Sequence, residues 1–169
     1  MLQYLRIKKF EHWLKIENWK LKIYLGSDHR GFELKEKLKQ KLTEWGHDYE
    51  DVGPFEYNKD DDYPKFGEAV AKKVVGQPGS RGIVICGSGV GIGVTANKTD
   101  GIRAGTVSSP DQAEAAVHDE DMNVLSLSAD FLTEEEALEI ARSFIIAKYG
   151  EAERYERRLN EIKEVEAAN

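Results

Sequence analysis

The chain has 169 residues, a formal net charge of −7 and one cysteine, Cys86. Its length suits a single domain with a full hydrophobic core. The acidic balance argues against nucleic acid as the main partner, although a few local arginines can still hold a phosphorylated metabolite. A lone cysteine excludes a disulfide framework and a cysteine-cluster zinc site, and it suits the reducing cytoplasm. The four histidines lack metal-ligand spacing, and no stretch approaches the roughly 20 apolar residues that span a membrane. We therefore predict a soluble cytoplasmic protein without a metal site.

Residues 1–20 differ in charge from the rest of the chain. Five basic and two acidic residues give this segment a net charge of +3, which leaves −10 for the remainder. Ile7, Phe10, Trp13 and Leu14 lie at helical spacing, so the segment is compatible with an amphipathic helix that docks on the domain or on a partner. The alternative is an appended segment without a catalytic role. We assign residues 1–21 to an N-terminal extension and residues 22–169 to the main domain.

From residue 22 onward, short apolar runs alternate with helical patterns. The first strand, 22–26, precedes a helix over 32–45, in which leucines recur at four-residue spacing until Gly46 ends the pattern. A second strand over 47–52 ends at Gly53-Pro54, and a helix over about 64–75 follows an acidic loop. The third strand, 81–85, leads into a glycine-rich turn and a short helix over 91–97.

The same alternation continues in the second half of the chain. A fourth strand over 102–107 precedes a helix over 110–117, with Ser109 as its cap. A fifth strand over 123–127 precedes a helix that opens with a capping box at Thr133 and Glu136 and extends to about residue 148. The last helix spans about 153–166. Near-continuous apolar strands separated by single helices predict a Rossmann-like three-layer α/β domain with a five-stranded parallel sheet.

Ligands of such sheets bind beyond the carboxyl ends of the strands. The third strand reaches that edge with Cys86, which is followed by Gly87, Gly89 and Gly91. Converging backbone N–H groups in such a turn bind phosphate or a developing oxyanion, so a thiol lies beside an anion-binding turn. One alternative is a core thiol above a tight turn. A dinucleotide-binding turn is disfavoured because these glycines follow the third strand rather than the first.

The first strand ends at the same edge with Asp28 and His29, which can hold a hydroxyl or a phosphate or transfer a proton. Asp28 can instead cap the helix that follows. Near the C-terminus, Arg154 and Arg158 are spaced so that both guanidinium groups reach one anion from one face of a helix. The neighbouring glutamates leave a solvated ion-pair face as the alternative.

Six motifs follow one another along residues 22–162: Gly26-Ser27-Asp28-His29 with Gly31-Phe32, Asp62-Tyr63-Pro64, Ile85-Cys86-Gly87-Ser88-Gly89-Val90-Gly91, Ala96-Asn97-Lys98, Gly101-Ile102-Arg103-Ala104 and Asn123-Val124-Leu125. In this order they resemble the ribose-5-phosphate isomerase B family, which includes the galactose-6-phosphate isomerase subunits. Only the N-terminal extension lies outside the resemblance.

The resemblance implies interconversion of aldose and ketose phosphates without a metal or an organic cofactor. It implies that Cys86 is the base that moves a proton between C1 and C2, while Ser88 and the glycine turn hold the oxyanion. The substrate-binding candidates that follow from it are Asp28, His29, Gly87, Gly89, Gly91, Asn97, Glu120, Arg154 and Arg158. It further implies a homodimer, or a tetramer, with shared active sites and a C-terminal helix that crosses to the partner. That helix carries an apolar stripe: Tyr155, Leu159, Ile162 and Val165. The stripe suits packing within the chain as well as packing against a partner.

One departure from the family pattern concerns ring opening. Four residues before Asn123, where the family has a histidine that assists this step, the chain has Asp119, and His118 lies one position earlier. Asp119 and His118 are therefore the two candidates for the group that removes the anomeric proton.

A second departure concerns the phosphate. Asp130 stands where many members have a phosphate-binding arginine, and a carboxylate there repels a phosphate unless Arg154, Arg158 or Arg103 compensates. We expect isomerisation of ribose 5-phosphate to ribulose 5-phosphate, with another pentose or hexose phosphate, or an inactive phosphosugar-binding module, as alternatives.

Overall fold

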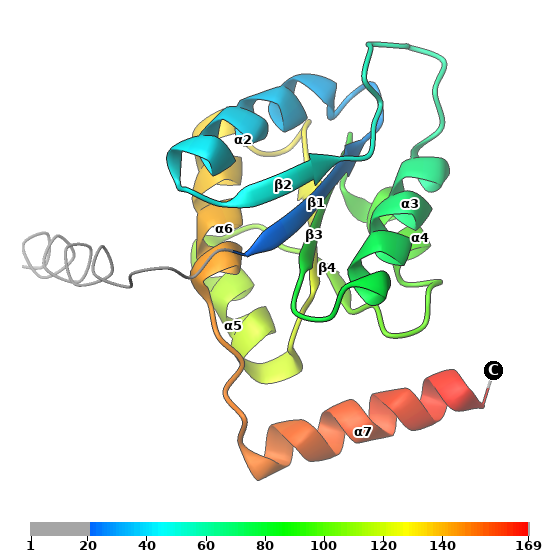
Figure 1. The fold of residues 1–169 in the computed structure, drawn as a ribbon, viewed down its shortest axis with the longest axis vertical. Helices are drawn as coiled ribbons and strands as arrows, with labels where there is room; N and C mark the ends of the chain where they lie inside the picture. Colours follow the sequence, from blue (N-terminus) through cyan, green and yellow to red (C-terminus); the bar gives the residue numbers. More distant parts are fainter. Residues whose placement is uncertain (1–20, 169) are drawn as a thin grey trace, which may run out of the picture.

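The computed structural model describes residues 21–168, and the expected N-terminal helix lies outside this range. Five parallel strands form one sheet in the order β2, β1, β3, β5, β4 (Figure 1). Their bounds are β1 (Lys22–Ser27), β2 (Asp48–Asp51), β3 (Arg81–Cys86), β4 (Ala104–Thr106) and β5 (Val124–Ser128). Ser27 of β1 pairs with Ile85 of β3, and Cys86 of β3 pairs with Ser128 of β5. These three strands therefore end together at one edge of the sheet.

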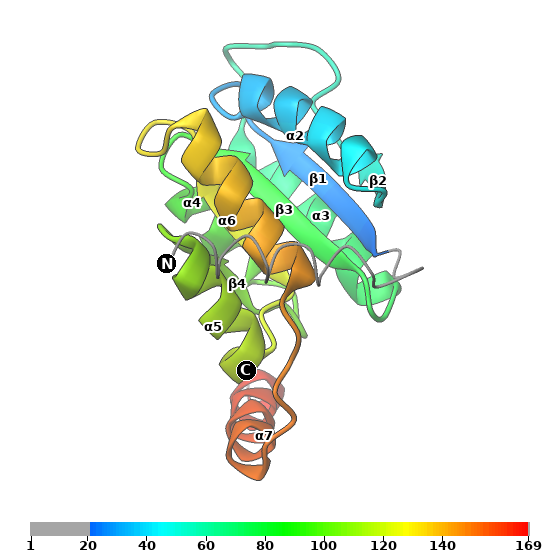
Figure 2. The same ribbon diagram turned by 90° about the vertical axis from the view of Figure 1, so that its left-hand side faces the viewer.

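Helices cover both faces of the sheet. Their bounds are α2 (Phe32–Glu44), α3 (Tyr63–Gly76), α4 (Val90–Ala96), α5 (Pro110–Glu120), α6 (Glu134–Ile146) and α7 (Glu153–Ala167). α2, α5 and α6 lie on the face that Figure 2 turns toward the viewer, and α3 and α4 lie on the other. Each face has its own hydrophobic core. Since successive strand residues point to opposite faces, Ile85 packs in the core under α2, α5 and α6, and Cys86 packs in the core under α3 and α4. The predicted three-layer α/β architecture is confirmed.

α5 is longer than its sequence pattern indicated. It runs to Glu120 and stops at Asp121, which adopts a left-handed conformation with φ of 47°. The expected end at Val117 was therefore wrong, and His118 and Asp119 lie on the last helical turn. β4 covers only Ala104–Thr106 and is shorter than the expected strand over 102–107. Just before it, the Arg103 N–H donates a hydrogen bond to the Asn123 side chain (2.8 Å).

α6 begins as expected and ends early. Thr133 and Glu136 form the predicted capping box, with both reciprocal hydrogen bonds present. The helix ends at Ile146 rather than near residue 148, because Ala147 adopts an extended conformation and the half-buried Arg81 guanidinium binds carbonyl groups at the helix end. Arg81 donates to the carbonyl oxygens of Ile145 (3.1 Å) and Ala147 (2.8 Å).

α7 lies at the end of the molecule opposite to the loop that joins β2 to α3 (Figure 1). It packs on α5, where Tyr155 is buried. Farther along the helix, Ile162 is 39% exposed and Val165 is 65% exposed. The apolar stripe of α7 is thus only partly covered within this chain. No helix within residues 21–168 combines the length and apolar character needed to cross a membrane.

Candidate active site

The glycine turn after β3 is bound to the end of β5. The Gly87 carbonyl oxygen accepts hydrogen bonds from Ser128 Oγ (2.7 Å) and the Asp130 N–H (3.0 Å), and the Cys86 carbonyl oxygen accepts one from the Ala129 N–H (3.0 Å). Gly89 has a φ of 76°, which favours glycine, and a Cβ atom there would lie 3.0 Å from the backbone of β5. Two strands therefore fix the turn, and the Cys86 side chain, 4% exposed, lies at its base.

Asp28 shapes the loop that follows β1. Its Oδ1 accepts hydrogen bonds from the backbone N–H groups of Arg30 (2.9 Å) and Gly31 (3.0 Å), and its own N–H donates to the Ile85 carbonyl oxygen (3.1 Å). A Cβ atom on Gly31 would lie 2.6 Å from that same oxygen, so the loop packs directly on the end of β3. Asp28 therefore acts as the turn-forming residue before α2 while lying one strand away from Cys86.

His29 is held by a carboxylate that the sequence analysis did not single out. Asp61 Oδ1 lies 2.8 Å from His29 Nδ1 and accepts a second hydrogen bond, of 2.9 Å, from the His29 N–H. The Asp61 side chain is only 2% exposed. A carboxylate at Nδ1 favours the tautomer with the proton on that nitrogen, which leaves Nε2 to accept one. Asp61 was visible in the sequence only as part of an acidic loop.

Two more residues complete the glycine turn. Ser88 is exposed, and its Oγ accepts a hydrogen bond from the Val90 N–H (3.2 Å) at the start of α4. The Tyr63 ring covers Gly91, since a Cβ atom on that glycine would lie 2.7 Å from Tyr63 Cζ. Tyr63 belongs to one of the six motifs but was not among the predicted site residues.

The structure places a second group of predicted site residues at the opposite edge of the sheet. α5 ends just before β5 begins, so His118, Asp119 and Glu120 lie where the strands start. His118 Nδ1 is 2.7 Å from Asp119 Oδ1. Hydrogen bonds from His118 and Tyr155, and then the nearby Arg154 charge, hold the pKa of Asp119 below its ordinary value. Within one chain these residues do not meet Cys86.

Three other predicted residues lie away from Cys86. Asn97 joins the end of α4 to the start of β4, because its amide exchanges two hydrogen bonds, of 2.9 and 2.7 Å, with the backbone of Ala104. Arg154 stacks on the Tyr155 ring, with its guanidinium carbon 4.6 Å from the ring centroid. Arg158 is exposed on α7.

Arg103 does not compensate for Asp130. Its guanidinium donates to Asp121 Oδ2 (2.6 Å) and to the Asp121 carbonyl oxygen (2.9 Å), at the edge where the strands start. Asp130 instead pairs with Arg30, across 2.7 Å between Nη2 and Oδ2. Of the three arginines named as compensation for Asp130, Arg103 is thus engaged at the other edge of the sheet, and the arginine that pairs with Asp130 comes from the loop after β1.

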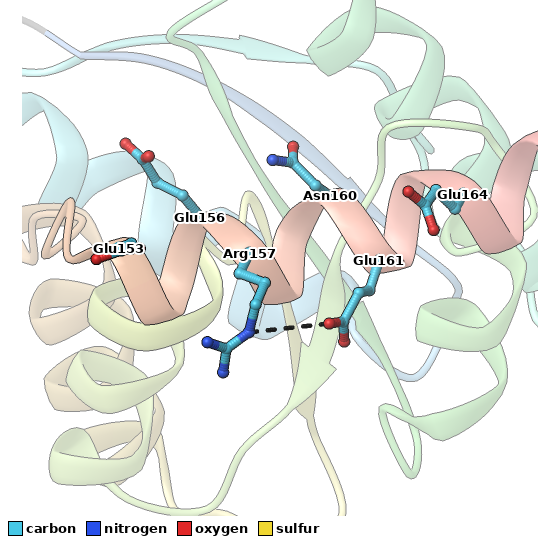
Figure 3. A pocket seen from close by; sticks show the side chains of 6 residues that line it. All are labelled: Glu153, Glu156, Arg157, Asn160, Glu161 and Glu164. Atoms are coloured by element: carbon cyan, nitrogen blue, oxygen red, sulfur yellow. Dashed lines mark ion pairs between the residues drawn. The ribbon is translucent and has the colours of Figure 1, made fainter.

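A hollow along α7 does not suit a phosphate. Figure 3 shows the side chains that line it: Glu153, Glu156, Arg157, Asn160, Glu161 and Glu164. Arg157 and Glu161 form an ion pair across 3.9 Å. Carboxylates dominate this face and repel anions. Arg154 and Arg158 do not line the hollow. Within residues 21–168, no group of three or more His, Cys, Asp or Glu side chains is arranged to hold a metal ion.

Known proteins resemble this chain over nearly all of the described residues. The family model described as Ribose/Galactose Isomerase matches residues 23–162. The ribose-5-phosphate isomerase B of Mycolicibacterium paratuberculosis is 38% identical over 146 residues, which cover 86% of this chain and 92% of that protein. A probable ribose-5-phosphate isomerase B of Mycoplasma pneumoniae is 39% identical over 140 residues, which cover 83% of this chain and 91% of that protein.

Solved structures agree with these sequence relatives. The ribose-5-phosphate isomerase B of Mycoplasma genitalium with bound ribulose 5-phosphate aligns with a TM-score of 0.85 and 35% identity, over 90% of this chain and all of that one. The ribose-5-phosphate isomerase B of Clostridium thermocellum aligns with a TM-score of 0.84 and 36% identity, over 88% of this chain and 99% of that one. The match over residues 23–162, together with these relatives, establishes that this chain belongs to the ribose/galactose isomerase family.

Proposed function

We propose that this chain is a sugar-phosphate isomerase that converts ribose 5-phosphate to ribulose 5-phosphate. Membership of the family and relatives that bear this name support the reaction. The observation that carries the proposal is the position of Cys86, which ends β3 at the glycine turn while the Asp28 loop packs on the neighbouring residue, Ile85. The same proposal places the enzyme in the cytoplasm, where a lone catalytic thiol stays reduced.

The reaction is an internal transfer of protons and electrons. In the open-chain sugar, the Cys86 thiolate removes the proton from C2, and the electron pair moves toward the C1 carbonyl oxygen to give an enediolate. Backbone N–H groups of the turn that begins at Gly87 stabilise the oxyanion. The proton returns to C1, and the C2 hydroxyl proton moves to the oxygen on C1, which leaves a carbonyl at C2. We assign Ser88 to the same oxyanion, and Asp28 and His29 to the sugar and phosphate ends of the substrate.

The active site of this proposal needs a second copy of the chain. The groups assigned to ring opening and to the phosphate, His118, Asp119, Arg154 and Arg158, lie at the edge of the sheet opposite to Cys86. α7 extends from that edge, and its apolar stripe is partly exposed. A homodimer in which each chain brings α7 and the end of α5 to the partner's Cys86 would unite both groups.

Another phosphosugar is the second candidate substrate, because Asp119 and Asp130 depart from the family pattern. Ring opening and phosphate binding depend on these positions, and both differ between pentose and hexose phosphates. Comparison of kcat/KM across a panel of pentose and hexose phosphates separates the two candidates. A preference for ribose 5-phosphate is expected, and its absence would remove the leading substrate.

The catalytic role of Cys86 is tested with Cys86→Ala. We expect kcat for ribose 5-phosphate to fall by roughly 10²–10⁴-fold, because the base that moves the C2 proton is lost. Binding of ribulose 5-phosphate, measured by calorimetry, should stay within about threefold. Lys41→Gln, which removes an exposed charge paired with Glu44 at 2.7 Å, is the control. A wild-type protein that exchanges no C2 proton with deuterated solvent would instead be an inactive binding module.

A further inference from the structure

Arg30 and Asp130 form an ion pair directly over the residue that follows Cys86. The contact is bidentate: Arg30 Nη2 lies 2.7 Å from Asp130 Oδ2, and Arg30 Nε donates to Asp130 Oδ1 at 3.2 Å. A Cβ atom on Gly87 would lie 2.7 Å from Asp130 Oδ2 and 2.8 Å from Arg30 Nε. The pair therefore rests against the anion-binding turn itself.

Hydrogen bonds hold the backbones of both Arg30 and Asp130 in place. Asp28 Oδ1 accepts the Arg30 N–H (2.9 Å), and the next residue, Gly31, packs on the end of β3. On the other side, the Asp130 N–H donates to the Gly87 carbonyl oxygen (3.0 Å). Arg30 and Asp130 are 100 positions apart in the sequence, yet both loops pack on the carboxyl end of β3. The fold thus brings the backbones of Arg30 and Asp130 to the same edge of the sheet, where their side chains meet.

The pair leaves Arg30 with donors to spare. A guanidinium has five N–H donors, and the two contacts to Asp130 occupy two of them. The Arg30 side chain is 56% exposed, whereas Asp130 is 32% exposed, so the cation is the more accessible member. A guanidinium in this position can donate two parallel hydrogen bonds to phosphate oxygens.

We propose that Arg30 receives the phosphate group of the substrate and that Asp130 is its positioning residue. This inference rests on the proposed sugar-phosphate isomerase function and names a residue that sets its specificity for phosphorylated substrates. Arg30 acts from the chain that supplies Cys86, in addition to the arginines that α7 of a partner brings. Asp130 holds the guanidinium over the glycine turn and does not itself touch the substrate.

Four variants of the full-length protein test this assignment: Arg30→Gln, Arg30→Lys, Asp130→Asn and the double variant Arg30→Gln/Asp130→Asn. In Arg30→Gln we expect KM for ribose 5-phosphate to rise by about tenfold to a hundredfold with kcat within about threefold, since a charge-assisted contact to the substrate is lost. The inhibition constant of inorganic phosphate should rise in parallel. Arg30→Lys should recover part of the loss, and Lys41→Gln should leave both constants unchanged.

The double variant separates binding by Arg30 from mere neutralisation of Asp130. If Arg30 binds the phosphate, the double variant stays as defective as Arg30→Gln, and Asp130→Asn alone has a smaller effect on KM. Recovery of wild-type KM in the double variant would show that each residue only cancels the other's charge, and an unchanged KM in Arg30→Gln would also overturn the inference. Circular dichroism and Tm confirm that each variant is folded.

Failure of the proposed function is distinguishable from failure of this inference. If the wild-type protein isomerises no phosphosugar, calorimetry with ribulose 5-phosphate and inorganic phosphate still compares it with Arg30→Gln. Weaker binding in the variant supports the role of Arg30 in a binding protein. Equal binding, or no binding of either ligand by the wild-type protein, overturns it.

Discussion

His29 depends on a carboxylate that lies 32 residues away in the sequence. The sequence predicted that His29 faces the substrate, and the structure adds that Asp61 Oδ1 holds both its ring nitrogen and its backbone N–H. The second Asp61 oxygen is buried without a protein partner. Asp61 therefore orients the imidazole and restricts which nitrogen can exchange a proton.

We predict that Asp61→Asn lowers kcat/KM by about tenfold to a hundredfold, because the ring loses the charged group that fixes its position. Asp60→Asn is the matched control, since Asp60 is 74% exposed and its ion pair is with Lys59. It should keep activity within about twofold. Equal activity of the two variants under steady-state assay would contradict a positioning role for Asp61.

At the scale of the elements, a buried lysine joins α2 to the end of β2. Lys35 is fully buried, and its Nζ donates to Asp51 and to the Pro54 carbonyl oxygen (2.8 Å). Lys39 contacts the same carboxylate at 2.9 Å. Leucine spacing predicted α2 but gave no sign that a lysine would be its most buried polar residue. The tie anchors the loop that carries Asp61.

We predict that Asp51→Asn lowers the free energy of unfolding by about 3 kcal/mol, because the buried Lys35 charge loses its nearer carboxylate and keeps only that of Glu36, at 3.4 Å. Lys35→Met should cost less, since Asp51 keeps its contact with Lys39. Urea titration of both variants at pH 7 measures the order. A greater loss in Lys35→Met would contradict this account.

The same contact makes stability depend on pH. Burial alone would raise the pKa of Asp51, but hydrogen bonds from Lys35, Lys39 and the Gly53 N–H outweigh it and hold the pKa below its usual value of 3.8. A lowered pKa in the folded state means that this stabilisation is complete above the unfolded pKa and is lost as pH falls through the folded value. Between pH 5 and pH 2, roughly, the wild-type protein should lose more stability than Asp51→Asn.

At the scale of the whole molecule, the two groups of site residues lie at opposite edges of one sheet. Cys86, His29 and Arg30 lie where the strands end, and the His118–Asp119 pair lies where they begin. Side-chain movement within one domain does not bring together groups that lie at opposite edges of the sheet. The proposed dimer is therefore a requirement of the proposed chemistry and not an addition to it.

Subunit complementation tests the shared site. Cys86→Ala and Arg154→Gln/Arg158→Gln should each be nearly inactive. After the two are mixed and subunits exchange, about a quarter of wild-type activity should return, because half of the dimers are mixed and each mixed dimer has one intact site. Mixing Cys86→Ala with Asp61→Asn, which lie at the same edge, should give no such recovery. Mixed dimers without regained activity would contradict a shared site.

The sequence by itself determined the elements and the centre of the proposed chemistry. Apolar strands, helical spacing and the Thr133 capping box depend on residues close together in the chain, so they could be predicted without coordinates. The same holds for Cys86 in its glycine turn. Only the tertiary structure decided that Asp61 holds His29 and that Arg30, rather than Arg103, pairs with Asp130. These contacts arise where separate strand ends meet at one edge, and the linear order of residues does not specify which side chains meet there.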